Sequence, residues 1–496
     1  MVLFGKRLAE ARIWHKPNME TLQRTANRGS ISTGFDVDNS VKLEVDNNEW
    51  LYRDAPTAGN RKTFTLSLWL KRAVLGHTPA GGDEYLAGQG SNARYHFAGD
   101  TIRFQFESGS TELESSRVYR DPSAWYHFVL AVDTSQGTAA NRVKLYVNGV
   151  QEAWNNTEYP SLNQESDWMN TNDLYIGTKW ASNSTGDGDN DLSGYLSEVV
   201  LLDGTAASPT SFGEFDSDSG IWKPIDVSGL TFGSQGFYLN FATAGDLGDD
   251  KSGNGNDLTE NNLAAADQAT DTPTNNFCTL NAVFVGSQSA APSDGATYMS
   301  DDGTNQTVSY AGTMGVTKGK WYYETYINSR SSSYGLTIYV GYHTFKDNYS
   351  ANAYTSSTNQ DSVALYGMHT GQYWTWNGGS RSVTSGLGSI GASGVGKYVG
   401  IALNLDDNQI TFYYDGSAIT NGSNLALNNL GTDTDAGIFA IPAIGNYDNN
   451  HTVNFGGYTG APISSAQSDA NGYGTFEHAP PSGYYALCTQ NLAEFG

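Results

Sequence analysis

GKWYYETYI (Gly319 to Ile327) opens the part of the chain that decides its fold. Three more phrases follow, and in each one apolar and polar residues alternate between ends marked by Gly, Asn or Asp. This is the pattern of antiparallel strands joined by turns, and it predicts a β-sandwich in the C-terminal half. The three phrases are LYGMHTGQYWTWNGG (Leu365 to Gly379), VGKYVGIALNLDDNQITFYYDG (Val395 to Gly416) and HTVNFG (His451 to Gly456).

An earlier series of alternating segments predicts a second sandwich in the N-terminal half. Turn residues bound each segment, and Asn148-Gly149 is a strong hairpin signal. The chain is therefore predicted to be an all-β protein of two antiparallel β-sandwiches. The segments are KTFTLSLWLKR (Lys62 to Arg72), DTIRFQFES (Asp100 to Ser108), AWYHFVLAVDT (Ala124 to Thr134), NRVKLYVNGVQ (Asn141 to Gln151), DLYIGTKW (Asp173 to Trp180) and GYLSEVVLLDG (Gly194 to Gly204).

The composition supports the same fold class. At 496 residues the chain is too long for one hydrophobic core. It contains 57 Gly, 30 Tyr and 11 Trp, which favours turns and strands over helices. The formal charge of −25 and the pI of about 4.5 argue against a nucleic-acid partner, because phosphate binding needs clustered Lys and Arg. No apolar run is long enough for a membrane span, so membrane insertion is not expected.

Charge and composition divide the chain into four parts. Residues 1–30 carry six Lys or Arg against two Glu, whereas the remainder is acidic. Residues 245–274 are rich in Asp, Asn, Gly and Thr and hold too few large apolar side chains to form a core. We predict a basic N-terminal attachment segment (1–30), a first sandwich (31–225), a strand followed by a polar linker (226–275), and a second sandwich with a packed C-terminal segment (276–496).

The order of these phrases resembles known families. The first series is similar to the laminin-G-like, concanavalin A-like jelly roll, and the second is similar to a SPRY domain. With DLGDDKSGNGNDLT between them and PPSGYYALCTQNL near the end, the whole resembles structural proteins of tailed, marine-type bacteriophages. This resemblance spans about residues 31–496. It implies a fibre or a capsid decoration on the virion surface that is synthesised in the host cytoplasm. It also implies a homo-oligomer, by analogy a trimer.

Residues 1–30 fall outside that resemblance, which suggests a virion-specific attachment segment. Its basic residues suit an acidic capsid or tail protein, and its large apolar side chains would add buried area. The alternative is a basic first helix that caps the first sandwich. The expected anchor residues are Leu3, Phe4, Lys6, Arg7, Arg12, Trp14 and Lys16.

We expect a protein that is not an enzyme. Retaining glycosidases need two carboxyl groups roughly 5 Å apart, and the related glucanases carry them on one strand face in an E-x-D-x-x-E phrase. That spacing occurs once in this chain, at Glu44, Asp46 and Glu49. Glu112 and Glu114 share one face of an expected strand, a pattern that is more typical of a solvated edge. The sequence has no H-E-x-x-H pair, G-x-S-x-G elbow or phosphate loop.

Calcium is the one cofactor that the sequence leaves open. Asp187, Asp189 and Asp191 place carboxylates at alternate positions, as calcium-binding loops do. Glu198 stands where an EF-hand would place its last ligand, but Leu192 occupies the position at which that loop needs Gly. The alternative is a solvated acidic turn.

The resemblance to SPRY domains places ligand recognition in loops at one end of the second sandwich. Aromatic and polar side chains there would supply stacking faces and hydrogen bonds for sugars or peptides. The expected ligand-binding residues are Tyr349, Tyr354, Tyr373, Trp376, Asn377 and Arg381. The implied function is a virion structural protein that binds host-surface glycans. The alternatives are a cellular lectin-like adhesin and, with less support, a polysaccharide-degrading tail appendage.

Two cysteines stand at the two ends of the second sandwich, Cys278 and Cys488. The first and last strands of a sandwich often lie together, so we expect these two residues to be neighbours. Two buried thiols and a disulfide are both open alternatives.

Overall fold

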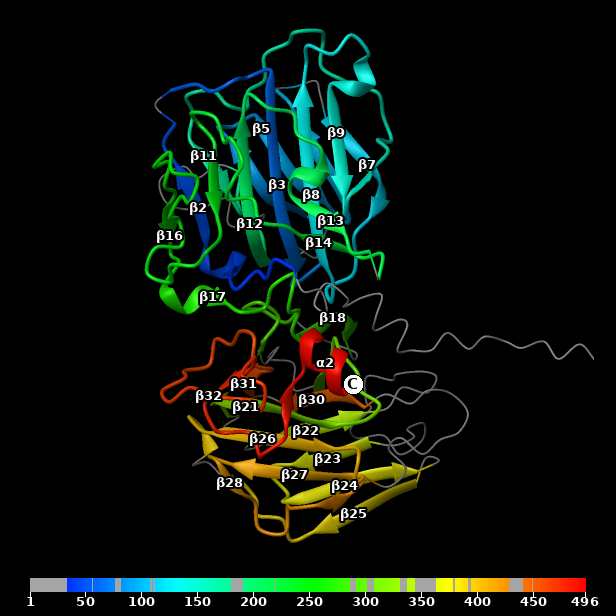
Figure 1. Ribbon diagram of the computed structural model, residues 1–496. Coiled ribbons are helices and arrows are strands. Elements are labelled where there is room, and N and C mark those ends of the chain that lie inside the picture. Colours follow the sequence, from blue (N-terminus) through cyan, green and yellow to red (C-terminus); the bar gives the residue numbers. More distant parts are fainter. Residues whose placement is uncertain are drawn as a thin grey trace, which may run out of the picture.

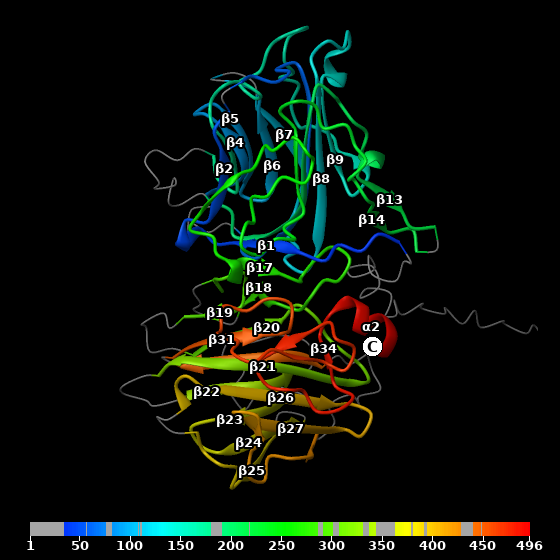
Figure 2. The ribbon, with the colours of Figure 1, turned by 60° about the vertical axis from the view of Figure 1, so that its left-hand side comes forward.

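The computed structural model describes residues 34–55, 57–75, 82–107, 109, 112–179, 191–217, 219–285, 291–300, 307–330, 337–343, 363–377, 380–390, 394–427, 440–447 and 449–496. Two β-sandwiches are stacked end to end, the first coloured blue to green and the second mainly yellow to red (Figure 1). A view from the side shows the same two tiers, with β1 (Ser40–Leu43), β17 (Gln268–Ala269) and β18 (Leu280–Val285) where they meet (Figure 2). The predicted all-β fold of two antiparallel sandwiches is confirmed.

Strand β3 (Thr63–Arg72) forms the middle of one sheet of the first sandwich. Leu66, Leu68 and Leu70 point to one side of this strand and are buried in the core, as expected from the two-residue period of a strand. The sheet has the order β10-β9-β8-β3-β12-β1-β17, and a further strand, β15, pairs with β12. The remaining strands are β8 (Trp125–Asp133), β9 (Val143–Val147), β10 (Val150–Gln151), β12 (Gly194–Asp203) and β15 (Phe237–Leu239).

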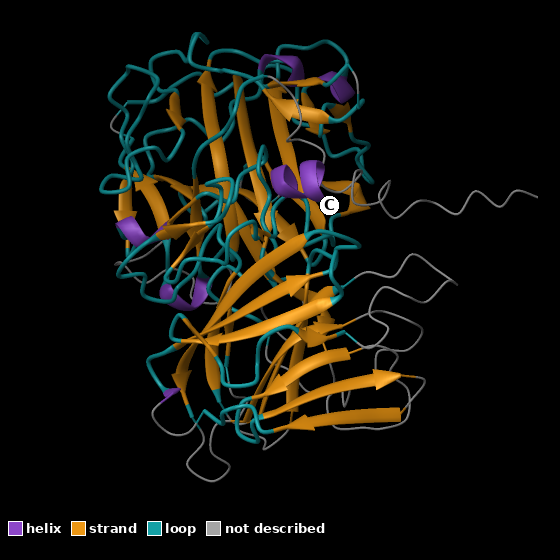
Figure 3. Ribbon diagram, turned by 60° about the horizontal axis from the view of Figure 1, so that its bottom comes forward, coloured by secondary structure: helices purple, strands orange, loops and turns teal. Residues whose placement is uncertain are grey.

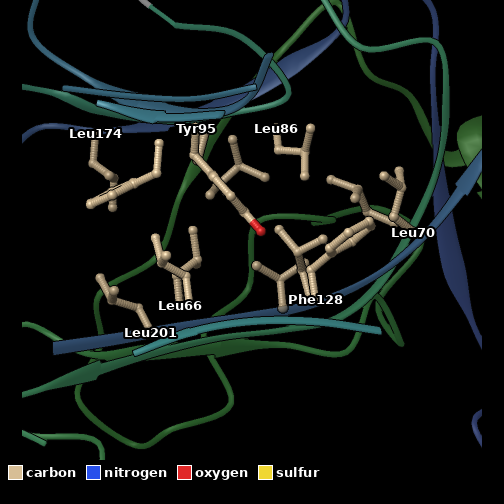
Figure 4. Packing of buried hydrophobic residues seen from close by; sticks show 14 of the residues in the cluster. Leu66, Leu70, Leu86, Tyr95, Phe128, Leu174 and Leu201 are labelled. Atoms are coloured by element: carbon tan, nitrogen blue, oxygen red, sulfur yellow. The ribbon is translucent and has the colours of Figure 1, made fainter. Parts of the chain in front are cut away.

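The opposite sheet of the first sandwich has the order β16-β2-β11-β4-β5-β6-β7. Its inner face meets the leucines of β3, and Figure 4 shows Tyr95 reaching between the two layers towards Leu66 and Phe128. Burial of these side chains is the main stabilising contribution, about 1.5–3 kcal/mol for each large apolar residue. The strands are β2 (Trp50–Arg53), β4 (Asp83–Gln89), β5 (Ala93–Ala98), β6 (Thr101–Gln105), β7 (Glu112–Val118), β11 (Leu174–Ile176) and β16 (Thr259–Asn261).

Residues from Ala207 to Tyr238 cover part of the outer face of the β3 sheet. The hairpin of β13 (Gly213–Phe215) and β14 (Trp222–Pro224) places Trp222 against Trp69 and Trp125, and Tyr238 joins a second apolar cluster with Val200. The segment 226–275 also supplies β15, β16 and β17, which pair with β12, β2 and β1. The polar stretch between the sandwiches is therefore hydrogen-bonded to both sheets of the first one.

The second sandwich consists of two further sheets, of order β18-β20-β30-β22-β23-β24-β25 and β19-β31-β21-β26-β27-β28. Strand β21 (Lys320–Ser329) carries the phrase GKWYYE, and its Trp321 and Tyr323 are buried in the core. The other strands are β19 (Tyr298–Met299), β20 (Thr307–Gly312), β22 (Thr337–His343), β23 (Val363–Gly367), β24 (Gln372–Asn377), β25 (Ser380–Ser385), β26 (Tyr398–Asn404), β27 (Gln409–Tyr414), β28 (Ser417–Ala418), β29 (Leu425–Ala426), β30 (Ile441–Tyr447) and β31 (Asn450–Asn454).

The C-terminal segment packs on the second sandwich. A short hairpin of β32 (Gln467–Ser468) and β33 (Thr475–Phe476) precedes β34 (Tyr485–Ala486), which pairs with β21, and α2 (Thr489–Phe495). The ring of Phe495 stacks on Tyr485 at a centroid distance of 3.9 Å. Strands form most of both tiers, whereas helices are short (Figure 3). The 3-10 helices are η2 (Val45–Asn47), η3 (Ala139–Asn141), η4 (Pro209–Ser211) and η5 (Ala265–Asp267).

Buried ion pairs join the two sandwiches. Lys42 on β1 lies within 2.8 Å of Glu49 and of Asp267, and 3.1 Å from Asp294 of the second sandwich. Burial alone would lower the pKa of Lys42, but Asp294, Glu49 and Asp267 together raise it above its ordinary value. Tyr458 donates a hydrogen bond of 2.7 Å to Asp294. This cluster therefore keeps its lysine charged at the boundary.

A second buried lysine anchors the connection between the sandwiches. Lys71, at the end of β3, donates to the Asp271 carboxylate at 2.6 Å and to the Asn276 side chain and the Phe277 carbonyl at 2.7 Å. Trp125 donates to the other oxygen of Asp271. All three lysine donors are thus satisfied by residues at the entry to the second sandwich.

The segments that carry the two cysteines are neighbours. The Cys278 amide donates to the Leu487 carbonyl, and Phe277 forms a bridge with Cys488. Consecutive residues of paired strands face opposite sides, so Cys278 packs in the sandwich core and Cys488 packs with Phe277 and Tyr322. Both cysteines are buried free thiols.

Candidate functional site

The predicted ligand-binding residues of the second sandwich are only partly described. Tyr349 and Tyr354 lie outside the described residues, and Trp376, Asn377 and Arg381 have described backbones on the paired strands β24 and β25. Tyr373 on β24 is 3% exposed, packs in the core, and donates a hydrogen bond to the Ala426 carbonyl. Its ring therefore has no free face for a ligand, because strand alternation turns it inward.

The predicted calcium ligands also fall partly outside the structure. Asp187 and Asp189 lie beyond the described residues, while Asp191 is buried and forms a bridge with Tyr85. Glu198 is buried in β12 and accepts a hydrogen bond of 2.7 Å from Tyr238. Within the described ranges, no group of three His, Cys, Asp or Glu residues is arranged to hold a metal ion. The calcium site stays a prediction.

The predicted anchor residues, Leu3 to Lys16, lie outside the described residues as well. The described chain begins at Gly34 and reaches the boundary between the sandwiches within a few residues, before β1 starts.

Glu112 and Glu114 lie side by side on β7, at the outer face of its sheet. Arg103 approaches both, at 3.8 Å and 3.4 Å, and Thr101 donates to Glu114 at 2.9 Å. His96 lies 3.5 Å from Glu112, and burial lowers its pKa to about 4. One arginine thus forms ion pairs with both glutamates.

A buried Ser–His pair in the first sandwich is oriented against nucleophilic chemistry. Trp222 donates to Nδ1 of His127 at 2.9 Å, so Nε2 carries the proton of the neutral ring and donates to the Ser67 hydroxyl at 2.8 Å. A general base would have to accept from that hydroxyl instead. Burial also lowers the pKa of His127 to about 3, and the ring stacks on Trp69. The pair is a structural feature of the covered sheet face.

A hollow of about 910 Å³ lies where the two sandwiches meet, and we call it the joint hollow. Four segments far apart in the sequence line it: 36–39 before β1, 270–275 after β17, 472–473 between β32 and β33, and 490–494 in α2. Its volume falls in the usual range for sites of small ligands, about 300–1,000 Å³. No single segment could form it alone.

Tyr473 is the aromatic residue of the joint hollow. Among residues with described side chains, Phe215 and Tyr473 are the most exposed aromatics, at 52% and 39%. Partial burial is the main cause that raises the pKa of the Tyr473 hydroxyl. Cys488 and the Glu494 and Asp36 carboxylates raise this pKa further. These effects place the ring close to the acidic rim of the hollow.

Asp469 fixes the loop that carries Tyr473. Its Oδ1 accepts hydrogen bonds from the amides of Tyr473 (2.8 Å) and Gly474 (3.2 Å). Its Oδ2 accepts from the Ala486 amide (2.8 Å) and from the side chain of Asn491 in α2 (2.7 Å). A buried carboxylate with four donors holds the loop in one conformation, so the exposed ring is preorganised.

The joint hollow was not predicted from the sequence. One local signal was available, because ANGYGTF (Ala470 to Phe476) places Tyr473 next to an Asn-Gly pair in a turn, where a large aromatic residue is seldom needed for packing. The other lining segments have no shared sequence pattern, since only the folded chain brings them together.

Comparison with known proteins supports the fold of the first sandwich. Residues 28–210 match a laminin G domain family that is described as the concanavalin A-like lectin/glucanases superfamily. No curated protein matches the chain. Within the described residues, no helix is both long enough and apolar enough to cross a membrane.

Solved structures with partial similarity have low sequence identity. The SPRY domain of human HERC1 is 16% identical, with a TM-score of 0.23, and the match covers 32% of this chain and 87% of that domain. The heptameric SAP-like pentraxin of Limulus polyphemus is 15% identical, with a TM-score of 0.27 and coverages of 35% and 80%. A Bacteroides ovatus protein described as carbohydrate-binding is 14% identical, with a TM-score of 0.31, and the match covers 46% of this chain and 59% of that protein.

Proposed function

We propose that this protein is a structural protein of a tailed bacteriophage particle, a fibre or a capsid decoration, that displays two sandwiches and binds host-surface glycans. The observation that carries the glycan-binding part is the first sandwich, whose residues 28–210 match a superfamily of lectins and glucanases. The joint hollow, with its preorganised aromatic ring, offers a surface for that task.

The particle role is supported by the way the sandwiches are joined. Lys42 and Lys71 are two buried, paired cations at the boundary, and their contacts support a display of both sandwiches as one unit. The net charge of −25 would keep many copies apart on a crowded surface. The basic segment of residues 1–30 precedes Asp36 at the joint and suits attachment to an acidic shell or tail protein.

Binding without bond cleavage fits the carboxylates of the first sandwich. Glu112 and Glu114 both form ion pairs with Arg103, at 3.8 Å and 3.4 Å, so this pair of carboxyl groups is engaged within the sheet. We therefore propose that the protein is not an enzyme and acts by recognition on the virion surface after its synthesis in the host cytoplasm.

Two experiments test this function. Mass spectrometry and antibody labelling of purified particles should find the protein in the virion, and deletion of residues 1–30 should give folded protein that is missing from particles. Full-length protein should bind a glycan array and release no reducing ends from the bound polysaccharides. Absence from intact particles would favour a cellular adhesin, and release of reducing ends would favour a degrading appendage.

A further inference from the structure

We infer that the joint hollow is a saccharide-binding site for uncharged or amine-bearing sugars, with Tyr473 as the stacking platform. This inference rests on the proposed glycan-binding function and names its site, which lies outside the sheets of the concanavalin A-like sandwich.

The hollow combines the two kinds of groups that a sugar ring needs. The Tyr473 ring can stack on the apolar face of a pyranose, and the Asp469 carboxylate holds its loop ready, so little order has to be gained on binding. Asn275 and Gln490 line the same hollow, where Asn275 Oδ1 accepts from the Gln490 backbone amide at 3.3 Å and Gln490 Nε2 donates to the Thr274 carbonyl at 3.4 Å, so that one further amide hydrogen remains on Gln490. The Tyr473 side chain is 39% exposed, so part of its surface is open to a ligand.

The charge of the rim selects the class of sugar. Asp36, Asp38 and Glu494 line the hollow. Carboxylate oxygens accept hydrogen bonds from sugar hydroxyls and from ammonium groups. Uronic acids and other anionic sugars would bring a like charge to this rim and bind more weakly.

The test uses the full-length protein and calorimetric titration with defined probes. These are neutral gluco-, galacto- and manno-oligosaccharides, chitosan oligosaccharides and oligogalacturonate. We expect binding to members of the first two groups and at least about tenfold weaker binding to oligogalacturonate. Tyr473→Ala should weaken binding by about tenfold, and Tyr473→Phe should stay within about threefold of the wild type. Phe215→Ala, at another exposed aromatic residue, is the matched control and should bind like the wild type.

A second variant keeps the test independent of Tyr473. Replacement of Asp36 and Asp38 by Asn should improve oligogalacturonate binding at least about threefold, because two like charges leave the rim. Glycan binding that survives Tyr473→Ala unchanged would overturn the inference and leave the proposed function intact. No binding to any probe would overturn both. If the protein bound a peptide of residues 1–30 and bound no sugar, the hollow would be the binding site of that basic segment. This result would also overturn the inference.

Discussion

Lys42 Nζ lies 3.1 Å from Asp294 Oδ1, across the boundary between the two sandwiches. The lysine is 1% exposed and also contacts Glu49 and Asp267, so one cation holds together a strand, the connecting segment and the second sandwich. Domains joined by a flexible linker have few such contacts. This pair is therefore the clearest reason to treat the two sandwiches as one unit.

Replacement of Lys42 by Met should destabilise the protein by about 3–5 kcal/mol, because three carboxylates would lose their shared cation in a buried place. Differential scanning calorimetry should show one transition for the wild type and two for the variant, since the sandwiches would lose their coupling. The control is Lys62→Met, which removes an exposed pair with Glu165 and should cost less than about 1 kcal/mol. A Lys42→Met protein as stable as the control variant would contradict this account.

The hydroxyl of Tyr95 should not stabilise the folded protein. It is fully buried between the sheets of the first sandwich, and no hydrogen-bond partner is found for it among the described residues. Tyr95→Phe should therefore leave the free energy of unfolding unchanged or raise it by about 1 kcal/mol. Urea unfolding would measure this difference.

Tyr323 provides the matched control for that experiment. Its hydroxyl donates to the Gly341 carbonyl at 2.8 Å and accepts from the Gly341 amide at 3.0 Å. Tyr323→Phe should therefore lower the free energy of unfolding by about 1–3 kcal/mol. Equal losses for the two variants would show that Tyr95 has a partner after all.

Glu198 should make stability depend on pH. Burial raises its pKa to about 7 from the ordinary value of 4.5, so the folded protein holds this proton more tightly than the unfolded chain. The stability that protonated Glu198 contributes is complete below pH 4.5 and is lost as the pH rises through 7. Relative to the wild type, Glu198→Gln should therefore gain stability between these values, by up to roughly 3 kcal/mol.

The comparison of the two proteins at each pH removes the effects of other groups. Burial lowers the pKa values of His127 and His451 to about 3, so these two rings lower the stability of the folded protein on acidification, opposite to Glu198. They are present in both proteins and cancel in the difference. A flat difference for Glu198→Gln would exclude the raised pKa.

A segment of this fold can be predicted from the sequence where a local pattern determines its structure, and it cannot where long-range contacts do. The alternation of Leu66, Leu68 and Leu70 predicts β3 because a buried strand face needs a two-residue period. The segment 245–274 has no such period, and it is held by polar contacts such as Asn254 and Asn256 to the Gly236 carbonyl. Its pairing through β16 could not be read from residue type.

The candidate site could not be predicted for a related reason. Tyr373 and Tyr473 both follow a Gly-containing turn, yet one lies in the core and the other at the surface. The loop of Tyr473 is held by Asp469, whose four hydrogen bonds come from the turn between β32 and β33, from β34 and from α2. Long-range contacts of this kind have no local pattern, so the sequence indicates a turn but not a binding surface.

Cys278 and Cys488 should stay reduced even in an oxidising buffer. Their segments are adjacent, but the two side chains point to opposite faces and pack in different clusters, so a disulfide would require the strands to move. Burial raises the pKa of Cys278 to about 11 and that of Cys488 to about 12, which leaves little reactive thiolate at pH 8. Alkylation with iodoacetamide should therefore be slow in the native protein and reach both thiols after unfolding in guanidinium. Mass spectrometry of non-reduced digests should find no peptide that is cross-linked through these two cysteines. Detection of such a peptide would contradict the packing described above.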